Sequence, residues 1–231
     1  MLVATANSGR TAWQCVAYKG KLDTLLQLWE WVEEKMTKVD VNSKLLLATD
    51  NAGMTALHDA ACEGNLEILL KIREWAEEKL TTDKINIKLL LAADNWGYTA
   101  WYWTVHEKNL NILLKVWERA EEQLTTEDVN IKLLLATDNE GMTAWQWAAH
   151  EGSLDILLQV CEWAERKITT EDKNRNLILA TDNEGLTALH KGAKEGNLDI
   201  MLKEWKWAEE KLTTEEINNK LLLATDNEGS T

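Results

Sequence analysis

Residues 50–68 read DNAGMTALHDAACEGNLEI, and near copies of this segment return along the 231-residue chain at a constant interval. The aspartate that opens the segment recurs every 44 residues, at Asp50, Asp94, Asp138, Asp182 and Asp226. A fixed period of about 20 to 50 residues is typical of repeat arrays, in which neighbouring copies bury each other's apolar faces. The sequence therefore predicts an array of similar units.

The period divides the chain into five units of a single solenoid domain that covers residues 1–231. We expect these units at residues 1–49, 50–93, 94–137, 138–181 and 182–231. The last unit is expected to cap the array, with DNEGST as a terminal turn fragment. In it Glu204 fills a slot that is apolar in the other units, and further polarity comes from Lys191, Lys194 and Lys206. Such a composition suits a face that meets solvent.

Each unit begins with a turn and a short helix, as the unit that opens at Asp138 shows. Side chains of this turn bond their own backbone, and Gly141 accepts a positive φ, so we expect a tight, hairpin-like turn. Thr143 is expected to cap a short helix that ends at Gly152 in the left-handed conformation. In the preceding unit Lys108 replaces this glycine, and a left-handed lysine costs roughly 1–2 kcal/mol.

Two further helices complete the unit. A second, amphipathic helix is expected from about Leu154 to Ile168, and a short third one begins at Thr169. The matching segment Thr213–Glu216 of the last unit has the pattern of a capping box. A leucine slot of the second helix never varies and is expected in the core: Leu26, Leu70, Leu114, Leu158 and Leu202. Tryptophans near its end are expected to pack between helices: Trp29, Trp31, Trp75, Trp117, Trp163, Trp205 and Trp207.

The segment 50–68 resembles the ankyrin repeat, because it is similar to the pattern D-x-x-G-x-T-P-L-H-x-A-A-x-x-G-x-L-x-I of that family. Ala56 stands where the family has proline, and the other copies also carry alanine there. The ankyrin unit has about 33 residues, so each copy here is 11 residues longer. We assign the excess to a longer second helix and an extra short helix. The resemblance implies an all-α repeat solenoid with hairpin-like turns and a concave groove that binds partners.

The slots that vary between copies lie at the turn tip and on the outward face of the first helix. In the central units they carry aromatic side chains, which dominate binding hot spots. We predict that a partner binds a contiguous patch there: Trp96, Tyr98, Trp103, His106, Met142, Trp147 and His150. Trp103 and Trp147 would form one platform. The alternative is that one or two of these tryptophans fill gaps between units.

Neither a metal nor a cofactor is predicted. His106 and His150 share one slot, but units about 10 Å apart hold their rings too far apart to share a zinc ion. His58 and His190 fill the family's histidine slot and are expected to bond the backbone. The chain has no glycine-rich phosphate loop, H-E-x-x-H or G-x-S-x-G motif, so an enzyme is disfavoured.

Composition restricts the class of protein further. The chain carries 39 acidic and 25 basic residues, a net charge of -14, which would repel a nucleic acid. No stretch approaches the roughly 20 apolar residues that cross a bilayer, and no secretory signal is present. Three cysteines without a C-x-x-C pair favour a reducing compartment. We expect a cytoplasmic or recombinant soluble protein that is not secreted and contacts no membrane.

An engineered array is predicted, since proline and phenylalanine are absent, the copies are nearly identical and both ends fall within the same turn region. The predicted function is that of a non-catalytic protein-binding scaffold, monomeric, with a protein partner of unknown identity. The alternative is a designed or duplicated structural array with no natural ligand. Self-association through exposed tryptophan is a further alternative, which light scattering would test.

Overall fold

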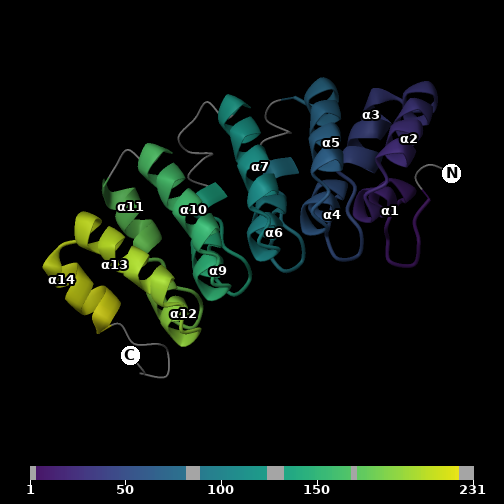
Figure 1. Ribbon diagram of the computed structural model, residues 1–231. Helices are drawn as coiled ribbons and strands as arrows, with labels where there is room; N and C mark the ends of the chain where they lie inside the picture. The colour runs from purple at the N-terminus through teal and green to yellow at the C-terminus, as the bar shows by residue number, and fades with distance from the viewer. Residues whose placement is uncertain (1–3, 82–88, 124–132, 168–170, 224–231) are drawn as a thin grey trace. The chain divides into compact units, whose positions relative to one another are not determined.

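The computed structural model describes residues 4–81, 89–123, 133–167 and 171–223, and the fold within them is an all-α repeat solenoid (Figure 1). Contacts gather into two compact units, residues 1–123 and 124–231. No helix in the described segments has both the length and the apolar character needed to cross a bilayer.

Within the described residues of unit 1, a short helix followed by a longer one recurs three times. Its elements are α1 (Ala12–Lys19), α2 (Leu22–Lys35), α3 (Lys38–Val41), the π-helix η1 (Asn42–Leu46), α4 (Ala56–Cys62), α5 (Leu66–Lys79), α6 (Ala100–His106) and α7 (Leu110–Gln123). The short helices α1, α4 and α6 pack side by side, and each also packs on its own long helix.

Unit 2 repeats this arrangement. Its elements are α9 (Ala144–His150), α10 (Leu154–Lys167), α11 (Glu171–Ile178), α12 (Ala188–Lys194), α13 (Leu198–Lys211), α14 (Thr214–Glu216) and the π-helix η3 (Ile217–Leu222). The short helix α9 packs against α12, and α13 contacts α10, α11 and α12.

The turn and the first helix follow the prediction closely. Gly141 has φ 79° and donates its N–H to the carbonyl of Asp138 at 3.0 Å, which closes the turn. Thr143 caps α9, and Gly152 follows it with φ 70°. Lys108 takes φ 54°, so the predicted left-handed lysine is confirmed.

The second and third helices are also found, with one addition. The helix α10 ends at Lys167, one residue before the expected end, while Thr169 lies outside the described residues. The capping box is confirmed, since the backbone N–H of Thr213 donates to Glu216 Oε2 at 2.9 Å and Glu216 N–H donates back to Thr213 Oγ1. The third segment widens into π-helix in η1 and η3, which the sequence did not reveal.

The core of the long helices does not use the leucine slot that was expected. Leu158 is 37% exposed and Leu202 is 59% exposed, so that prediction is wrong. The slot one residue earlier faces inward instead, with Leu25, Leu69, Leu113 and Leu157 buried. Adjacent residues of a helix differ by about 100° in direction, and both slots are apolar, so the apolar pattern alone did not distinguish them.

The tryptophans of the long helices pack as predicted, with two departures. Trp29 stacks on Trp75 with ring centroids 4.3 Å apart, and both rings contact Trp13. The buried members also include Trp117, Trp163 and Trp207. Trp31 is 49% exposed, and Trp205 is only half-buried. Trp75 packs on the copy before it, whereas Trp31 belongs to the first copy of the chain.

Glu204 contradicts the expectation that it faces solvent. The residue is 4% exposed, and neither carboxylate oxygen has a hydrogen-bond partner among the described residues. It lines a small cavity with apolar side chains only: Trp145, Ile178, Ala188, Leu189 and Leu221. Burial without a partner raises the pKa of this carboxyl to about 8. Lys191 is buried as well, because it pairs with Asp182, while Lys194 and Lys206 are exposed.

Candidate functional site

The opening aspartate of each copy holds the turn with one carboxylate oxygen and a variable side chain with the other. Asp94 Oδ1 accepts the N–H groups of Trp96 and Tyr98, each at 2.9 Å. Its Oδ2 accepts the indole Nε1–H of Trp103, also at 2.9 Å. The turn and the indole are therefore fixed by the same buried carboxylate.

The same arrangement recurs in unit 2. Asp138 Oδ2 accepts the indole Nε1–H of Trp147 at 2.8 Å. In the last copy Lys191 takes this place and pairs with Asp182 Oδ2. The slot thus changes its chemistry while keeping a donor for the aspartate.

Aromatic rings gather around Trp103 in unit 1. Tyr98 meets the indole edge-on with centroids 5.2 Å apart, and His106 does so at 5.3 Å. Tyr98 also stacks on Tyr102 at 4.5 Å. Trp96, at the turn tip, is 51% exposed. Four predicted site residues of unit 1 therefore share one surface region of the short helix and its turn, which we call the aromatic cluster (Trp96, Tyr98, Trp103 and His106).

Unit 2 contributes fewer exposed groups than expected. Trp147 is half-buried and meets the ring of His150 edge-on at 5.3 Å. His150 Nδ1 lies 3.5 Å from Glu195 Oε1. Met142 is only 2% exposed, and Met54 in the same slot of unit 1 is 5% exposed, whereas Tyr98 in that slot stays half-buried. The prediction that Met142 belongs to the exposed patch is therefore wrong. A platform of Trp103 with Trp147 stays a prediction.

An ion cluster that sequence reasoning missed joins the first two copies. Arg10 donates from Nε to Asp50 Oδ2 at 3.1 Å and from Nη2 to Asp59 Oδ1 at 2.8 Å. Its guanidinium lies 4.6 Å from the centroid of the Tyr18 ring. Burial raises the pKa of Asp59 to about 7, although Arg10 opposes the rise. Arg10 and Asp59 carry opposite charges in variable slots of adjacent copies, and this was the signal in the sequence that could have revealed the contact.

The histidines of the family slot form hydrogen bonds with backbone groups, as predicted: the N–H groups of Thr55 and Thr187 donate to His58 and His190. His58 contacts Thr55 Oγ1 through Nδ1 at 2.7 Å and the carbonyl of Ala92 through Nε2 at 3.0 Å. Burial lowers the pKa of His58, so the ring is neutral at pH 7. His190 Nδ1 contacts Thr187 Oγ1 at 2.7 Å. His58 is fully buried and His190 is half-buried, and the threonine that donates to each is the one that caps the short helix.

Asparagines link consecutive turns, a role that the sequence analysis did not assign. The side-chain Nδ2 of Asn51 donates to the carbonyl of Asn7 at 3.1 Å, and that of Asn95 donates to Asn51 at 2.9 Å. In unit 2 Asn183 donates to Asn139 at 2.9 Å. The recurrence of asparagine directly after every opening aspartate was the available signal. The ladder fixes the turn tips that carry the variable residues.

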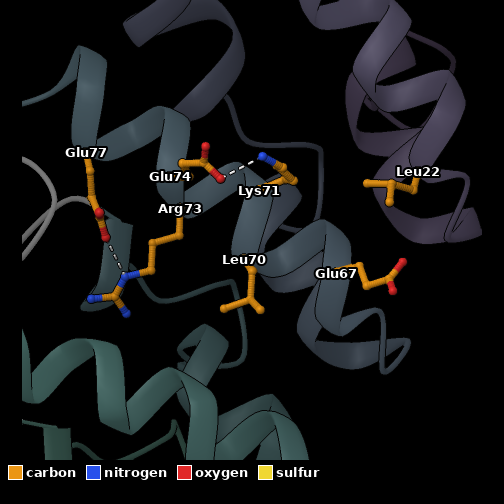
Figure 2. Close-up of a pocket in the computed structure, with 7 residues that line it drawn as sticks. All are labelled: Leu22, Glu67, Leu70, Lys71, Arg73, Glu74 and Glu77. Carbon is orange, nitrogen blue, oxygen red and sulfur yellow. Dashed lines mark hydrogen bonds and ion pairs between the residues drawn. The ribbon is translucent and has the colours of Figure 1, made fainter.

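A separate hollow of about 460 Å³ lies along α5, away from the turns (Figure 2). It is lined by Leu22, Glu67, Leu70, Lys71, Arg73, Glu74 and Glu77. Its charges pair along the helix, Lys71 with Glu74 at 2.8 Å and Arg73 with Glu77 at 3.1 Å. Arg73 also donates to the carbonyl of Val116. The lining offers no nucleophile beside a base, so it does not resemble a catalytic site.

The ankyrin-repeat family model matches residues 52–73, which run from the turn tip through α4 into α5. No curated protein matches the chain. The matched segment contains Gly53 of the turn, the capping residue Thr55 and the short helix α4. An ankyrin repeat is typical of a protein-interaction scaffold and is typically non-catalytic.

Proposed function

We propose that this chain is a non-catalytic scaffold that binds a protein partner through the aromatic side chains of its turns and short helices. The binding residues are Trp96, Tyr98, Trp103, His106, Trp147 and His150. The observation that carries the proposal is the hydrogen bond from Trp103 to Asp94, because it holds a half-exposed indole in one orientation. An aromatic side chain fixed before binding loses little entropy when a partner arrives.

The position of these rings also favours recognition over packing. The helix α6 already supplies Trp101 to the core, and α9 supplies Trp145, each at most 2% exposed. Trp103 and Trp147 lie two residues further along and remain half-buried. A second indole on the other face of the same short helix adds contact area where a partner can reach it.

The test is capture of partners from a cell lysate on immobilised protein, with the Trp103→Ala/Trp147→Ala double variant beside the wild type. We expect the variant to lose a partner, because truncation of a hot-spot tryptophan costs about 2 kcal/mol or more of binding. Circular dichroism must first show that both proteins fold. Trp31→Ala is the matched control, since it removes an indole that is 49% exposed on α2.

Each result has a definite meaning. A partner that the double variant loses and Trp31→Ala keeps would locate binding on the short helices. If the double variant captures the same proteins as the wild type, the aromatic surface is not the binding site. If neither captures anything selectively, the alternative of a structural array without a natural ligand is favoured. The uniform copies, with no proline and no phenylalanine, support our further proposal that the array is engineered.

A further inference from the structure

A glutamate follows the short helix in successive copies of the repeat. Four successive copies place one directly after the short helix: Glu63, Glu107, Glu151 and Glu195. A carboxylate at the C-terminal end of a helix opposes the helix dipole, so its interaction with its own helix is unfavourable. The recurrence of an unfavourable charge at this point therefore favours a role outside the helix itself.

Two of these carboxylates in unit 1, those of Glu63 and Glu107, lie beside an aromatic or imidazole ring. Glu107 Oε1 is 2.9 Å from His106 Nδ1, and His106 packs edge-on against Trp103. A hydrogen bond from Tyr18 to Glu63 and the charge of Glu63 raise the pKa of the Tyr18 phenol. A ring face next to a carboxylate is the environment that holds a guanidinium, which stacks on one and donates to the other.

The chain already holds one arginine of its own on this surface. Arg10 stacks over Tyr18 and donates to Asp50 and Asp59, as described above. Arg10 does not satisfy the cluster, since Asp59 Oδ2 has no hydrogen-bond partner among the described residues. Desolvation, together with the charges of Glu107, Glu63 and Asp59, raises the pKa of the Cys62 thiol to about 11. The carboxylates of Asp59, Glu63 and Glu107 therefore lie near one another around Cys62, at the C-terminal end of α4.

We propose that the partner segment is an arginine-bearing peptide whose guanidinium groups pair with Glu63 near Tyr18 and with Glu107 beside His106 and Trp103. This inference rests on the protein-binding function proposed above and names the chemistry of the partner. Arginine fits better than lysine, because its planar fork stacks on a ring while it donates to a carboxylate. An acidic segment would be repelled by a chain of net charge -14.

The test is titration of the full chain with four synthetic nonapeptides, followed by calorimetry. The peptides share a Gly/Ser frame and differ in three residues, which are arginine, lysine, glutamate or citrulline. Citrulline keeps the shape of arginine without its charge. We expect the arginine peptide to bind at least about tenfold more tightly than the citrulline peptide, and its binding should weaken as salt rises.

Two double variants locate the site. Glu63→Gln/Glu107→Gln should weaken the arginine peptide about tenfold. The matched control, Glu74→Gln/Glu118→Gln, removes the same charge from α5 and α7, where these carboxylates pair with Lys71 and Lys115. It should change the affinity by less than about twofold. Equal losses in both variants would show attraction to net charge alone and would overturn the proposal, as would equal binding of the citrulline peptide.

The peptide titration and the lysate experiment test the two proposals independently of each other. If Trp103→Ala/Trp147→Ala loses a captured partner but the arginine peptide does not bind, the aromatic side chains bind a partner, and the proposal of an arginine-bearing partner is wrong. If the peptide binds and depends on Glu63 and Glu107 while the tryptophan variant captures the same proteins, the cationic site stands and the aromatic surface is wrong.

Discussion

Trp103 donates its indole hydrogen to Oδ2 of Asp94 across 2.9 Å, and Asp94 is 7% exposed. Trp103→Phe keeps a ring but removes this donor to a buried charge. We expect the free energy of unfolding to fall by about 2 kcal/mol, which urea denaturation measures. Trp96→Phe is the control, because that indole is 51% exposed at the turn tip, and its effect should stay within about 0.5 kcal/mol. Equal effects would show that the hydrogen bond adds no stability.

Glu204 should make the stability of the last copy depend on pH. Its pKa is raised from 4.5 to about 8 in the folded chain. A raised pKa means that the folded state binds the proton more tightly, so the contribution is complete below about pH 4.5 and is lost as pH rises through 8. The difference amounts to roughly 5 kcal/mol as an upper value. Urea denaturation at a series of pH values should show the decline.

Glu204→Val should remove most of this decline and raise stability at pH 8, because Val160 fills the same slot in the preceding copy with its side chain buried. Glu210→Gln serves as the control on the same helix, since its side chain is exposed. A Glu204→Val variant that keeps the pH dependence of the wild type would assign that dependence to other groups.

Arg10→Met should destabilise unit 1. The change leaves the carboxylate of Asp59 buried without its cation, a loss of roughly 3 kcal/mol. The loss should shrink as pH falls below about 7, where Asp59 takes up a proton. Thermal denaturation at pH 5.5 and pH 8 measures both effects. Arg166→Met breaks an exposed pair with Glu162 and should change stability by less than about 0.5 kcal/mol; a similar loss there would mean that Asp59 is not the cause.

Lys108→Gly should raise the melting temperature. Lys108 holds φ 54°, which strains any side chain with a Cβ atom. After the entropy cost of glycine we expect a gain of roughly 1 kcal/mol, or about 2–4 °C. The reverse change Gly152→Lys should lower it, because a Cβ there would meet Asn197 Oδ1 at 2.9 Å. No shift in either variant would show that the left-handed position is not strained.

The turn and caps were predictable because their causes are local. Gly141 is required by a positive φ, and Thr143 caps the helix that begins at the next residue. Both statements depend on residues within four positions of each other. The ankyrin-like pattern then placed Trp103 and Trp147 on the outward face of the short helix, where the structure finds them half-buried.

What failed depends on contacts between copies. Leu25 and Leu26 are chemically identical, and only the packed neighbours decide that Leu25 faces inward. Glu204 was assigned to solvent by its charge, yet α13 packs it toward Trp145 and Leu221. The pairing of Arg10 with Asp59 joins residues 49 positions apart, beyond any local pattern.

The two carboxylate oxygens of the opening aspartate have different roles. One maintains the turn, and the other bonds a side chain that varies between copies. In Asp94, Asp138 and Asp182, the Oδ1 atom accepts a backbone N–H of the turn. The Oδ2 atom accepts an indole N–H in Asp94 and Asp138 and pairs with an ammonium group in Asp182. In Asp50, the Oδ2 atom accepts a guanidinium N–H. Three donor chemistries, indole, ammonium and guanidinium, thus occur on the same turn backbone within one chain. We expect a combinatorial library that randomises Trp103, Trp147 and Lys191 among side chains that can donate to the aspartate to retain folded members, so that the surface chemistry of these copies can be changed at a single slot each.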